Sequence, residues 1–343
     1  MFNPGEGDFR SARSMKWMTD ITIKGPDQPI EYTDPLLLVG SCFTEHIGNR
    51  LQDLKFSVLQ NPHGILFDPL SVCNSLVSYI DKKVYQPADL FFYNELWQSW
   101  SHHSRFSGMD QEQVLANINQ SQHKAHIFLQ SARWLVITLG SSFSYRLTEN
   151  EKDVANCHRA PAQWFQKHMC TIDETVAALD NTLYRLFRFN PHLRVIFTVS
   201  PVRHLRDGIV ENNRSKARLL EAVHHLVNKF NRLYYFPAYE LVIDVLRDYR
   251  FYDIDLAHPN YQATEFVLEK FRQHYISAPA HQLMDQVQQV ITARRHKAFQ
   301  PGTNAHRQFL ESFAGKTARL REQYPFLDLS EEADYFESGA RRE

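Results

Sequence analysis

The stretch "PLLLVGSCFTEHIGNRLQ" (35–52) decides the fold of this chain. Its apolar run ends at Gly40, and an amphipathic segment begins near Thr44. Uninterrupted apolar character predicts a strand that is buried on both faces, as strands of parallel sheets are. The turn between the two segments sets the hydroxyl of Ser41 beside the thiol of Cys42.

Two further runs have the same character, "WLVITLG" (134–140) and "RVIFTVSP" (194–201). Apolar residues at helical spacing follow in 171–193, with Thr171 as a capping residue and Asn190-Pro191 as the stop, and again in 214–233. The region around Lys216 is expected to be the solvated start of that second helix. The alternation predicts a doubly wound, mostly parallel α/β sheet flanked by helices, which binds ligands beyond the carboxyl ends of its strands.

Three segments differ from this pattern. Residues 1–14 are polar and predict a loose N-terminal extension, which leaves 15–279 as the α/β domain. The aromatic stretch 91–107 predicts a packed insertion, because aromatics at this density more often pack together than stack on sugars. Residues 280–343 predict a helical appendage of two polar helices and an acidic tail through Glu332. The appendage indicates either a homo-oligomer or packing within one chain.

Composition excludes several classes of function. Net charge is −1, so no electrostatic field favours nucleic acid or an anionic membrane surface. No apolar run approaches the roughly 18 residues of a membrane-spanning helix, and the first residues have no signal-peptide core. We expect a cytoplasmic protein whose four cysteines are reduced thiols, with Cys73 and Cys170 in the core.

Two short motifs carry groups suited to nucleophilic catalysis. Ser41 and Cys42 lie where the first strand meets a helix N-terminus, which lowers a thiol pKa and favours an oxyanion. The alternative is a tight turn with a buried structural cysteine. Asp255 and His258 are three residues apart, so the carboxylate can reach Nδ1 and leave Nε2 free as a base. A solvated turn or a helix cap is the alternative for this pair.

Together the motifs resemble a known arrangement. "GSCFTE" (40–45) resembles the Gly-Asp-Ser-Leu-Thr-Glu opening of SGNH (GDSL-type) hydrolases, and Asp255-Leu-Ala-His258 resembles their closing Asp-x-x-His block. The chain is still more similar to the GSCFA family, an SGNH-like group, over about residues 15–275. That resemblance rests on five motifs in the same order: "GSCFTEHIG", "NPHGILFDP" (61–69), "NCHRAP" (156–161), "SPVRHLRDG" (200–208) and "YRFYDIDLAHPN" (249–260).

The resemblance implies roles for single residues. In the gapless register Cys42 falls on the nucleophile, whereas a slip of one residue would make Ser41 the nucleophile. The second block implies an oxyanion contact from the Gly64 N–H, beside that of Cys42. The third block should be Gly-x-Asn, but this chain has Gly140-Ser141-Ser142. A missing oxyanion donor costs about 3–4 kcal/mol, and either Ser142 or Asn156 would have to replace it.

Further residues are expected around the pocket. The family match implies that Asn156 and His158 are loop residues near the site, with a packing role as the alternative. Arg203 and His204 follow a strand end, where Arg203 could clamp a substrate carboxylate or phosphate. A surface salt bridge is the alternative for Arg203. Zinc-type side chains occur in 157–170, but their spacing is not that of a structural zinc site, so we expect no metal.

The sequence therefore predicts an SGNH-like acyl hydrolase that needs no cofactor. His258 would serve as base and then acid, Asp255 would orient it, and the substrate would be an ester or thioester, either a small molecule or a glycan acyl ester. Two alternatives stay open. One is a non-catalytic protein that binds acyl or carbohydrate ligands on the same fold, and the other is an acyltransferase that uses the same residues.

Overall fold

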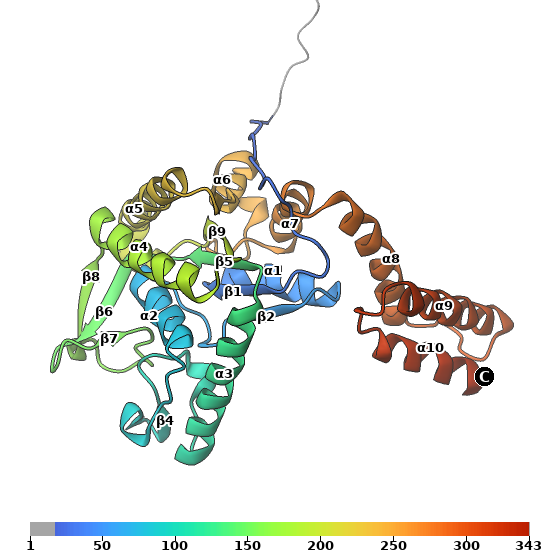
Figure 1. Ribbon diagram of the computed structural model, residues 1–343, viewed down its shortest axis with the longest axis horizontal. Helices are drawn as coiled ribbons and strands as arrows, with labels where there is room; N and C mark the ends of the chain where they lie inside the picture. The colour runs from blue at the N-terminus through green and yellow to red at the C-terminus, as the bar shows by residue number, and fades with distance from the viewer. Residues whose placement is uncertain (1–17, 343) are drawn as a thin grey trace, which may run out of the picture.

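The computed structural model describes residues 18–342 and has a five-stranded parallel sheet at its centre (Figure 1). The strands lie in the order β10-β9-β5-β1-β2. Counted along the chain this is the order 2-1-3-4-5 of flavodoxin-like sheets, so the predicted fold class is confirmed. Their bounds are β1 (Leu36–Gly40), β2 (Val58–Gln60), β5 (Trp134–Leu139), β9 (Arg194–Val199) and β10 (Leu233–Tyr235).

Helices cover both faces of this sheet, which explains the uninterrupted apolar strands. Along β1, Leu36 and Leu38 face one layer of helices while Leu37 and Val39 face the other. The first layer contains α1 (Cys42–Asp53), α6 (Ala238–Glu240), α7 (Tyr261–Tyr275) and α8 (Ala278–Arg295). The second contains α2 (Pro69–Ile80), α3 (Gln111–Ser131), α4 (Ile172–Phe189) and α5 (Gly208–Lys229).

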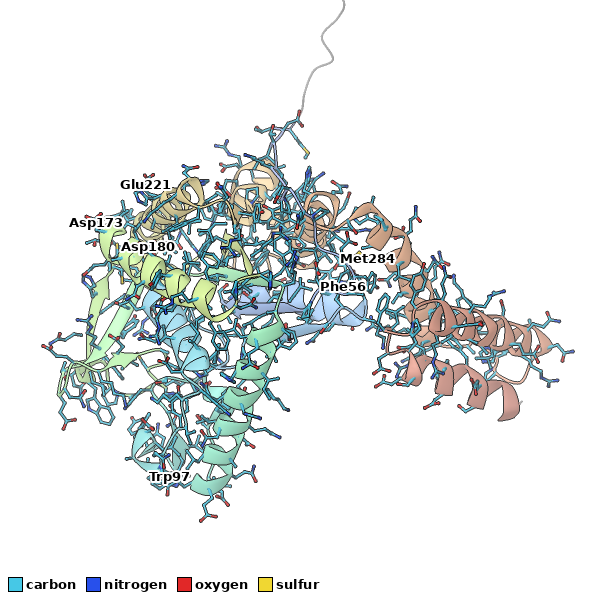
Figure 2. All side chains as sticks on the ribbon, viewed as in Figure 1. Phe56, Trp97, Asp173, Asp180, Glu221 and Met284 are labelled. Atoms are coloured by element: carbon cyan, nitrogen blue, oxygen red, sulfur yellow. The ribbon has the colours of Figure 1, made fainter. Side chains whose placement is uncertain are left out.

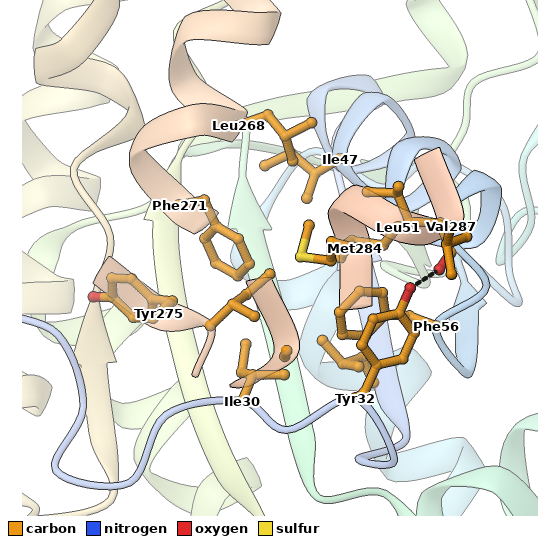
Figure 3. Packing of buried hydrophobic residues seen from close by; sticks show 14 of the residues in the cluster. Ile30, Tyr32, Ile47, Leu51, Phe56, Leu268, Phe271, Tyr275, Met284 and Val287 are labelled. Atoms are coloured by element: carbon orange, nitrogen blue, oxygen red, sulfur yellow. Dashed lines mark hydrogen bonds between the residues drawn. The ribbon is translucent and has the colours of Figure 1, made fainter. Parts of the chain in front are cut away.

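The first layer holds α1 firmly in place (Figure 3). Ile47 and Leu51 of α1 share a buried cluster with Phe271 of α7 and Met284 of α8. Burial of each such side chain contributes about 1.5–3 kcal/mol relative to its exposed state. The Tyr32 hydroxyl also donates a hydrogen bond to the Leu54 carbonyl just beyond α1. The helix that begins at Cys42 is thereby packed along its length.

The second layer differs from expectation in one respect. Helix α4 begins as predicted, since Thr171 and Glu174 form a reciprocal capping box, and it ends before Asn190-Pro191. Helix α5, however, begins at Gly208, well before the predicted start. Lys216 therefore lies inside the helix on its sheet-facing side and is only 1% exposed. The expectation of a solvated Lys216 was wrong.

Two small antiparallel sheets extend from the central one. Strands β3 (Phe91–Tyr93) and β4 (Leu96–Gln98) form a hairpin within the aromatic insertion, in which Trp97 of β4 pairs with Phe92 of β3 (Figure 2). Trp100 stacks on Phe91 at a centroid distance of 3.5 Å and is buried, as is His102, so the predicted packing role is confirmed for this part. The second sheet consists of β6 (Phe143–Leu147), β7 (Asp153–Val154) and β8 (Phe165–Met169).

The C-terminal helices project to one side of the molecule (Figure 1). They are α8, α9 (Asn304–Gln323) and α10 (Ser330–Arg342). The predicted acidic tail is wrong here, because α10 buries Phe336 in the same cluster as α1 and places Glu332 within 3.0 Å of Lys55 and 2.9 Å of Arg294. Homo-oligomer formation through these helices stays a prediction. The expected loose extension, residues 1–14, lies outside the described residues.

None of the helices between residues 18 and 342 combines the length and the hydropathy that a membrane-spanning helix requires.

Gly40 offers a test of how tightly β1 and β5 fit together. It has φ of +134°, and a Cβ at this position would overlap the backbone carbonyl of Thr138. Gly40→Ala should therefore lower the free energy of unfolding by at least about 3 kcal/mol, measured by urea denaturation. Gly315→Ala is the matched control: it lies in α9 with open space around it, so it should stabilise by about 0.5–1 kcal/mol. Equal effects of both substitutions would contradict this packing.

Candidate active site

Cys42 lies at the point where β1 turns into α1. The turn is held by three bonds: Ser41 N–H donates to the Thr138 carbonyl at 3.0 Å, Gly40 N–H donates to Asn61 Oδ1 at 2.9 Å, and Leu66 N–H donates to the Gly40 carbonyl at 2.9 Å. Cys42 is the first residue of α1, at the carboxyl edge of the sheet between β1 and β5. Ligands of doubly wound sheets bind at such a reversal of strand order.

Ser41 and Cys42 occupy different environments. Ser41 is the N-cap of α1 and is 1% exposed, and its Oγ has no hydrogen-bond partner among the described residues. Cys42 is partly exposed. A reagent or substrate from solvent therefore reaches the thiol before the hydroxyl, which favours the gapless register with Cys42 as nucleophile.

The surroundings of Cys42 act on its pKa in opposite directions. Burial raises the pKa of the thiol, while the backbone N–H groups of Phe43 and Cys42 lower it by hydrogen bonding to the sulfur. Glu45 raises the pKa and Lys216 lowers it. Because burial is the largest of these causes, the Cys42 thiol is protonated near neutral pH, so a base would be required to activate it.

Asp255 and His258 form the expected pair. His258 Nδ1 lies 2.5 Å from Asp255 Oδ2, and Asp255 Oδ1 accepts the backbone N–H groups of Ala257 and His258 at 3.0 Å. These backbone bonds, followed by the His258 side chain, lower the pKa of Asp255 to about 2. The carboxylate is thus ionised at neutral pH and accepts a hydrogen bond from the Nδ1–H group of His258. The other ring nitrogen, Nε2, is then available as the basic nitrogen.

The loop that carries this pair is fastened to the β9 loop. Arg203 N–H donates to the Ala257 carbonyl at 3.1 Å, and the Arg203 guanidinium lies over the Tyr252 ring at 4.7 Å. Helix α7 follows this loop and packs against α1. No hydrogen bond joins Cys42 to His258 within residues 18–342, so a catalytic contact between them would have to form when substrate binds.

Two of the expected oxyanion donors, Gly64 and Ser142, are engaged elsewhere. Gly64 has φ of +81°, and its N–H donates to the Asn61 carbonyl at 2.7 Å. Ser142 is fully buried, and both its N–H and its hydroxyl bond to Ser215 Oγ, at 2.8 and 3.1 Å. In this conformation neither group points a free donor at Cys42.

The remaining predicted site residues fall into two groups. His204 lies near the carboxyl edge of the sheet, whereas Asn156 and His158 lie against the aromatic insertion. His204 packs edge-on against Phe67, and burial, followed by the Lys216 charge, lowers its pKa to about 4. Asn156 accepts the His158 N–H at 2.8 Å, and His158 Nε2 lies 2.8 Å from the Ser99 carbonyl. These last two residues belong to the packing of the aromatic insertion.

Among the zinc-type residues, the structure groups a different set from the one in the sequence motif. His168, Cys170 and Glu174 have potential ligand atoms within 4.8 Å of one another. Glu174 is already engaged, because it accepts the Thr171 N–H of the capping box at 2.7 Å and lies 2.8 Å from His168 Nε2. The capping box of α4 and the contact of Glu174 with His168 therefore explain why these side chains lie close together. Cys73 and Cys170 are buried as expected, and all four cysteines are free thiols.

A cavity of about 500 Å³ lies along the outer side of α2, beside Asp153 and Ala155. Neither Cys42 nor His258 lines it.

Sequence reasoning missed two groups of functional interest. Asn61 Nδ2 donates to Glu45 at 3.2 Å, and Arg105 forms an ion pair with Glu45 at 3.0 Å, so these side chains brace the first turn of α1. The pairing of "GSCFTE" with "NPHGI" in order along the chain was the available signal for Asn61. Lys216 is the second, and its neighbours in sequence gave no sign of burial.

Comparisons with known proteins identify a family and find similarity to solved structures. A family model described as "GSCFA family" matches residues 35–271, and one described as "GSCFA domain protein, C-terminal domain" matches residues 287–342. Among solved structures, the chain is similar to an acetyl xylan esterase from the rumen bacterium Butyrivibrio proteoclasticus, with 11% identity and a TM-score of 0.36. That alignment covers 72% of this chain and 64% of the esterase, less than two thirds of its length. A comparison with curated proteins found no match.

The burial of His63 leads to a prediction of how the free energy of unfolding changes with pH. Burial lowers the pKa of His63, which lies 3.0 Å from Gln122 Oε1, to about 4. Between pH 6.5 and about 4 the unfolded chain binds a proton at His63 that the folded chain does not, so stability is complete above 6.5 and falls with pH below it. The slope is about 1.4 kcal/mol per pH unit for this residue.

We therefore expect urea denaturation to show less acid destabilisation in His63→Gln than in the wild type, by about 1.4 kcal/mol at pH 5.5. His123→Gln, at an exposed position of α3, is the control and should follow the wild type. A His63→Gln slope equal to that of the wild type would show that His63 is charged in the folded protein.

Proposed function

This chain belongs to the GSCFA family, and we propose that it is an acyl hydrolase in which Cys42 attacks an ester or thioester carbonyl. The observation that carries the proposal is the Asp255–His258 pair, 2.5 Å apart, on a loop tied to the sheet edge where Cys42 begins α1. Nucleophile, base and orienting carboxylate are the three parts of a hydrolytic triad.

In the first half of the reaction His258 Nε2 takes the Cys42 proton as the sulfur attacks the carbonyl carbon. The tetrahedral intermediate collapses when His258 returns this proton to the departing alcohol or thiol, which leaves an acyl group on the sulfur. Water then attacks the thioester with His258 as base, and the acid and the free thiol are released. Asp255 stabilises the imidazolium in both halves.

The oxyanion would be held at the start of α1. The N–H groups of Cys42 and Phe43 are in the first helical turn, where they have no carbonyl acceptor within the helix and lie against the Cys42 sulfur. Gly64 would contribute a second donor after its bond to Asn61 opens. Ser142 and Asn156 would need larger rearrangements, because Ser142 is bonded to Ser215 and Asn156 to the His158 backbone.

The substrate we propose is an acyl ester of a small molecule or a glycan. The loop beside His258 exposes Ile254 and Leu256, which supply apolar surface for an acyl chain. The Arg203 guanidinium makes a cation–π contact with Tyr252. In this proposal Arg203 therefore stabilises the conformation of the loop and does not bind a substrate anion. An acyltransferase would use the same residues with another acceptor in place of water.

The occupied oxyanion donors favour a second candidate function. With Gly64 and Ser142 engaged, the surface around Cys42 and His258 would bind an acyl or carbohydrate ligand without turning it over. A protein of this kind would retain ligand binding after Cys42 is replaced, and it would release no product from an activated ester.

Substitution tests the proposed roles. Cys42→Ala and His258→Ala should each lower the turnover of a short-chain p-nitrophenyl ester or thioester by at least about 1,000-fold. Thermal midpoints should stay within about 2 °C of the wild type, because both side chains lie at the edge of the sheet. Turnover is followed by p-nitrophenol release, and folding by thermal denaturation.

Ser41→Ala is the matched control for the register. It should keep most of the activity, because in this proposal the partly exposed Cys42 is the nucleophile and Ser41 is buried. An inactive Ser41→Ala together with an active Cys42→Ala would transfer the role to Ser41. A wild-type chain that binds the ester analogue but releases no product would support the binding protein.

A further inference from the structure

Lys216 is a fully buried cation at the carboxyl edge of the sheet. It lies on α5 and is 1% exposed. Its Nζ donates to the Gly140 carbonyl at 2.5 Å and to the Ser200 carbonyl at 2.6 Å. Gly140 directly follows β5 and Ser200 directly follows β9, so the ammonium group joins the ends of two neighbouring strands.

This cation has no carboxylate partner within residues 18–342. Its two acceptors are neutral carbonyls, and the acidic group that acts on its charge is the thiol of Cys42. A buried ammonium without an anion costs several kcal/mol in solvation. Accordingly, burial lowers the pKa of Lys216 to about 7, and the Cys42 charge acts in the opposite direction.

The position of Gly140 brings this cation close to the nucleophile. Gly140 packs against Ser41, so closely that a Cβ on Gly140 would lie 3.3 Å from the Ser41 Cβ. Ser41 immediately precedes Cys42 and is bonded to the Thr138 carbonyl of β5. The Gly140 carbonyl, which accepts a hydrogen bond from Lys216, therefore belongs to a residue that packs against the turn of Ser41 and Cys42.

The other charged groups around Cys42 do not supply a cation. Glu45, one turn further along α1, is acidic and is held by Arg105. His204, on the loop between β9 and α5, has a pKa of about 4 and is neutral at pH 7. The His258 imidazole makes no hydrogen bond to Cys42 within the described residues. Of the groups whose charges act on the Cys42 thiol, Lys216 is the one that can be positive.

We propose that Lys216 is a positioning residue that holds a positive charge beneath the Cys42 thiolate and so stabilises the ionised nucleophile. The inference rests on the proposed function in that Cys42 is the nucleophile there. The alternative is a purely structural clamp, in which Lys216 ties β5 to β9 and has no influence on the thiol. Both roles use the same two carbonyl bonds, so only the charge distinguishes them.

Alkylation of Cys42 by iodoacetamide across pH tests this inference, with mass spectrometry to locate the adduct. Lys216→Gln keeps an amide donor for one carbonyl but loses the charge, and Lys216→Met loses both. In each variant the alkylation rate at pH 6–7, where Lys216 of the wild type is charged, should fall several-fold, and the rates should converge above about pH 8, where Lys216 of the wild type is neutral. Lys216→Arg retains the charge and should react at pH 6–7 at least as fast as the wild type.

Lys229→Gln is the matched control, because Lys229 lies on the same helix but is exposed and paired with Asp180 at 3.2 Å. It should leave the alkylation profile unchanged. If Lys216→Met lowers the thermal midpoint while neither neutral variant moves the alkylation profile, Lys216 is a clamp and the proposal is wrong.

A measurement on the wild-type chain alone covers the case in which the variants do not fold. A positive charge beneath the sulfur attracts anionic iodoacetate, so the ratio of iodoacetate to iodoacetamide rates should be higher at Cys42 than for free cysteine in solution. An equal or lower ratio would contradict the proposal.

The alkylation results separate this proposal from the proposed hydrolase activity. A shifted profile in a chain that hydrolyses no ester would support Lys216 as the charge partner and refute the hydrolase. An unshifted profile in an active hydrolase would refute the role of Lys216 alone.

Discussion

The close approach of Gly40 to the Thr138 carbonyl is the contact on which the rest of the site depends. It allows β1 and β5 to lie side by side up to the residue before Ser41, so α1 begins directly at the edge of the sheet. The N–H groups of the first turn of α1 then lie beside the Cys42 sulfur. The apolar layer between α1, α7 and α8 fixes the helix, and α7 in turn follows the loop that carries His258. One backbone contact thus positions the thiol relative to the whole site.

The pKa values of the side chains at this edge of the sheet depend more on burial than on ion pairs. Burial raises the pKa of Cys42 and lowers those of His204 and Lys216, so near neutral pH the Cys42 thiol and the His204 imidazole are neutral and Lys216 is about half-charged. The exposed exception is Asp255, which backbone N–H groups keep ionised. In this account the negative charge on sulfur arises during the reaction, when the proton leaves Cys42 for His258, and the N–H groups of the α1 terminus and the charged form of Lys216 stabilise the thiolate.

The sequence was sufficient where one local signal determines the structure. The apolar runs predicted three central strands because burial on both faces leaves no polar alternation, and Thr171 predicted the start of α4 because a capping box is local. The Asp255–His258 pair was predicted from a spacing of three residues. Long-range contacts were not accessible in this way. Lys216 looks like any polar helical residue until α5 packs on the sheet, and the engagement of Gly64 and Ser142 depends on Asn61 and Ser215. Helix α10 was predicted to be an acidic tail because the ion pairs of Glu332 with Lys55 and Arg294 form only in the folded chain.

The central claim is that Cys42 carries the acyl group between the two halves of the reaction, and trapping of that intermediate tests it most directly. The chain is mixed with p-nitrophenyl acetate, quenched in acid within the first turnover and analysed by peptide mapping, with the partly exposed Cys157 as the internal reference. The account predicts one acetyl group on Cys42, formed together with a stoichiometric burst of p-nitrophenol, and no comparable adduct on Cys157. An acetyl group on Ser41, or equal slow labelling of Cys42 and Cys157 without a burst, would contradict it.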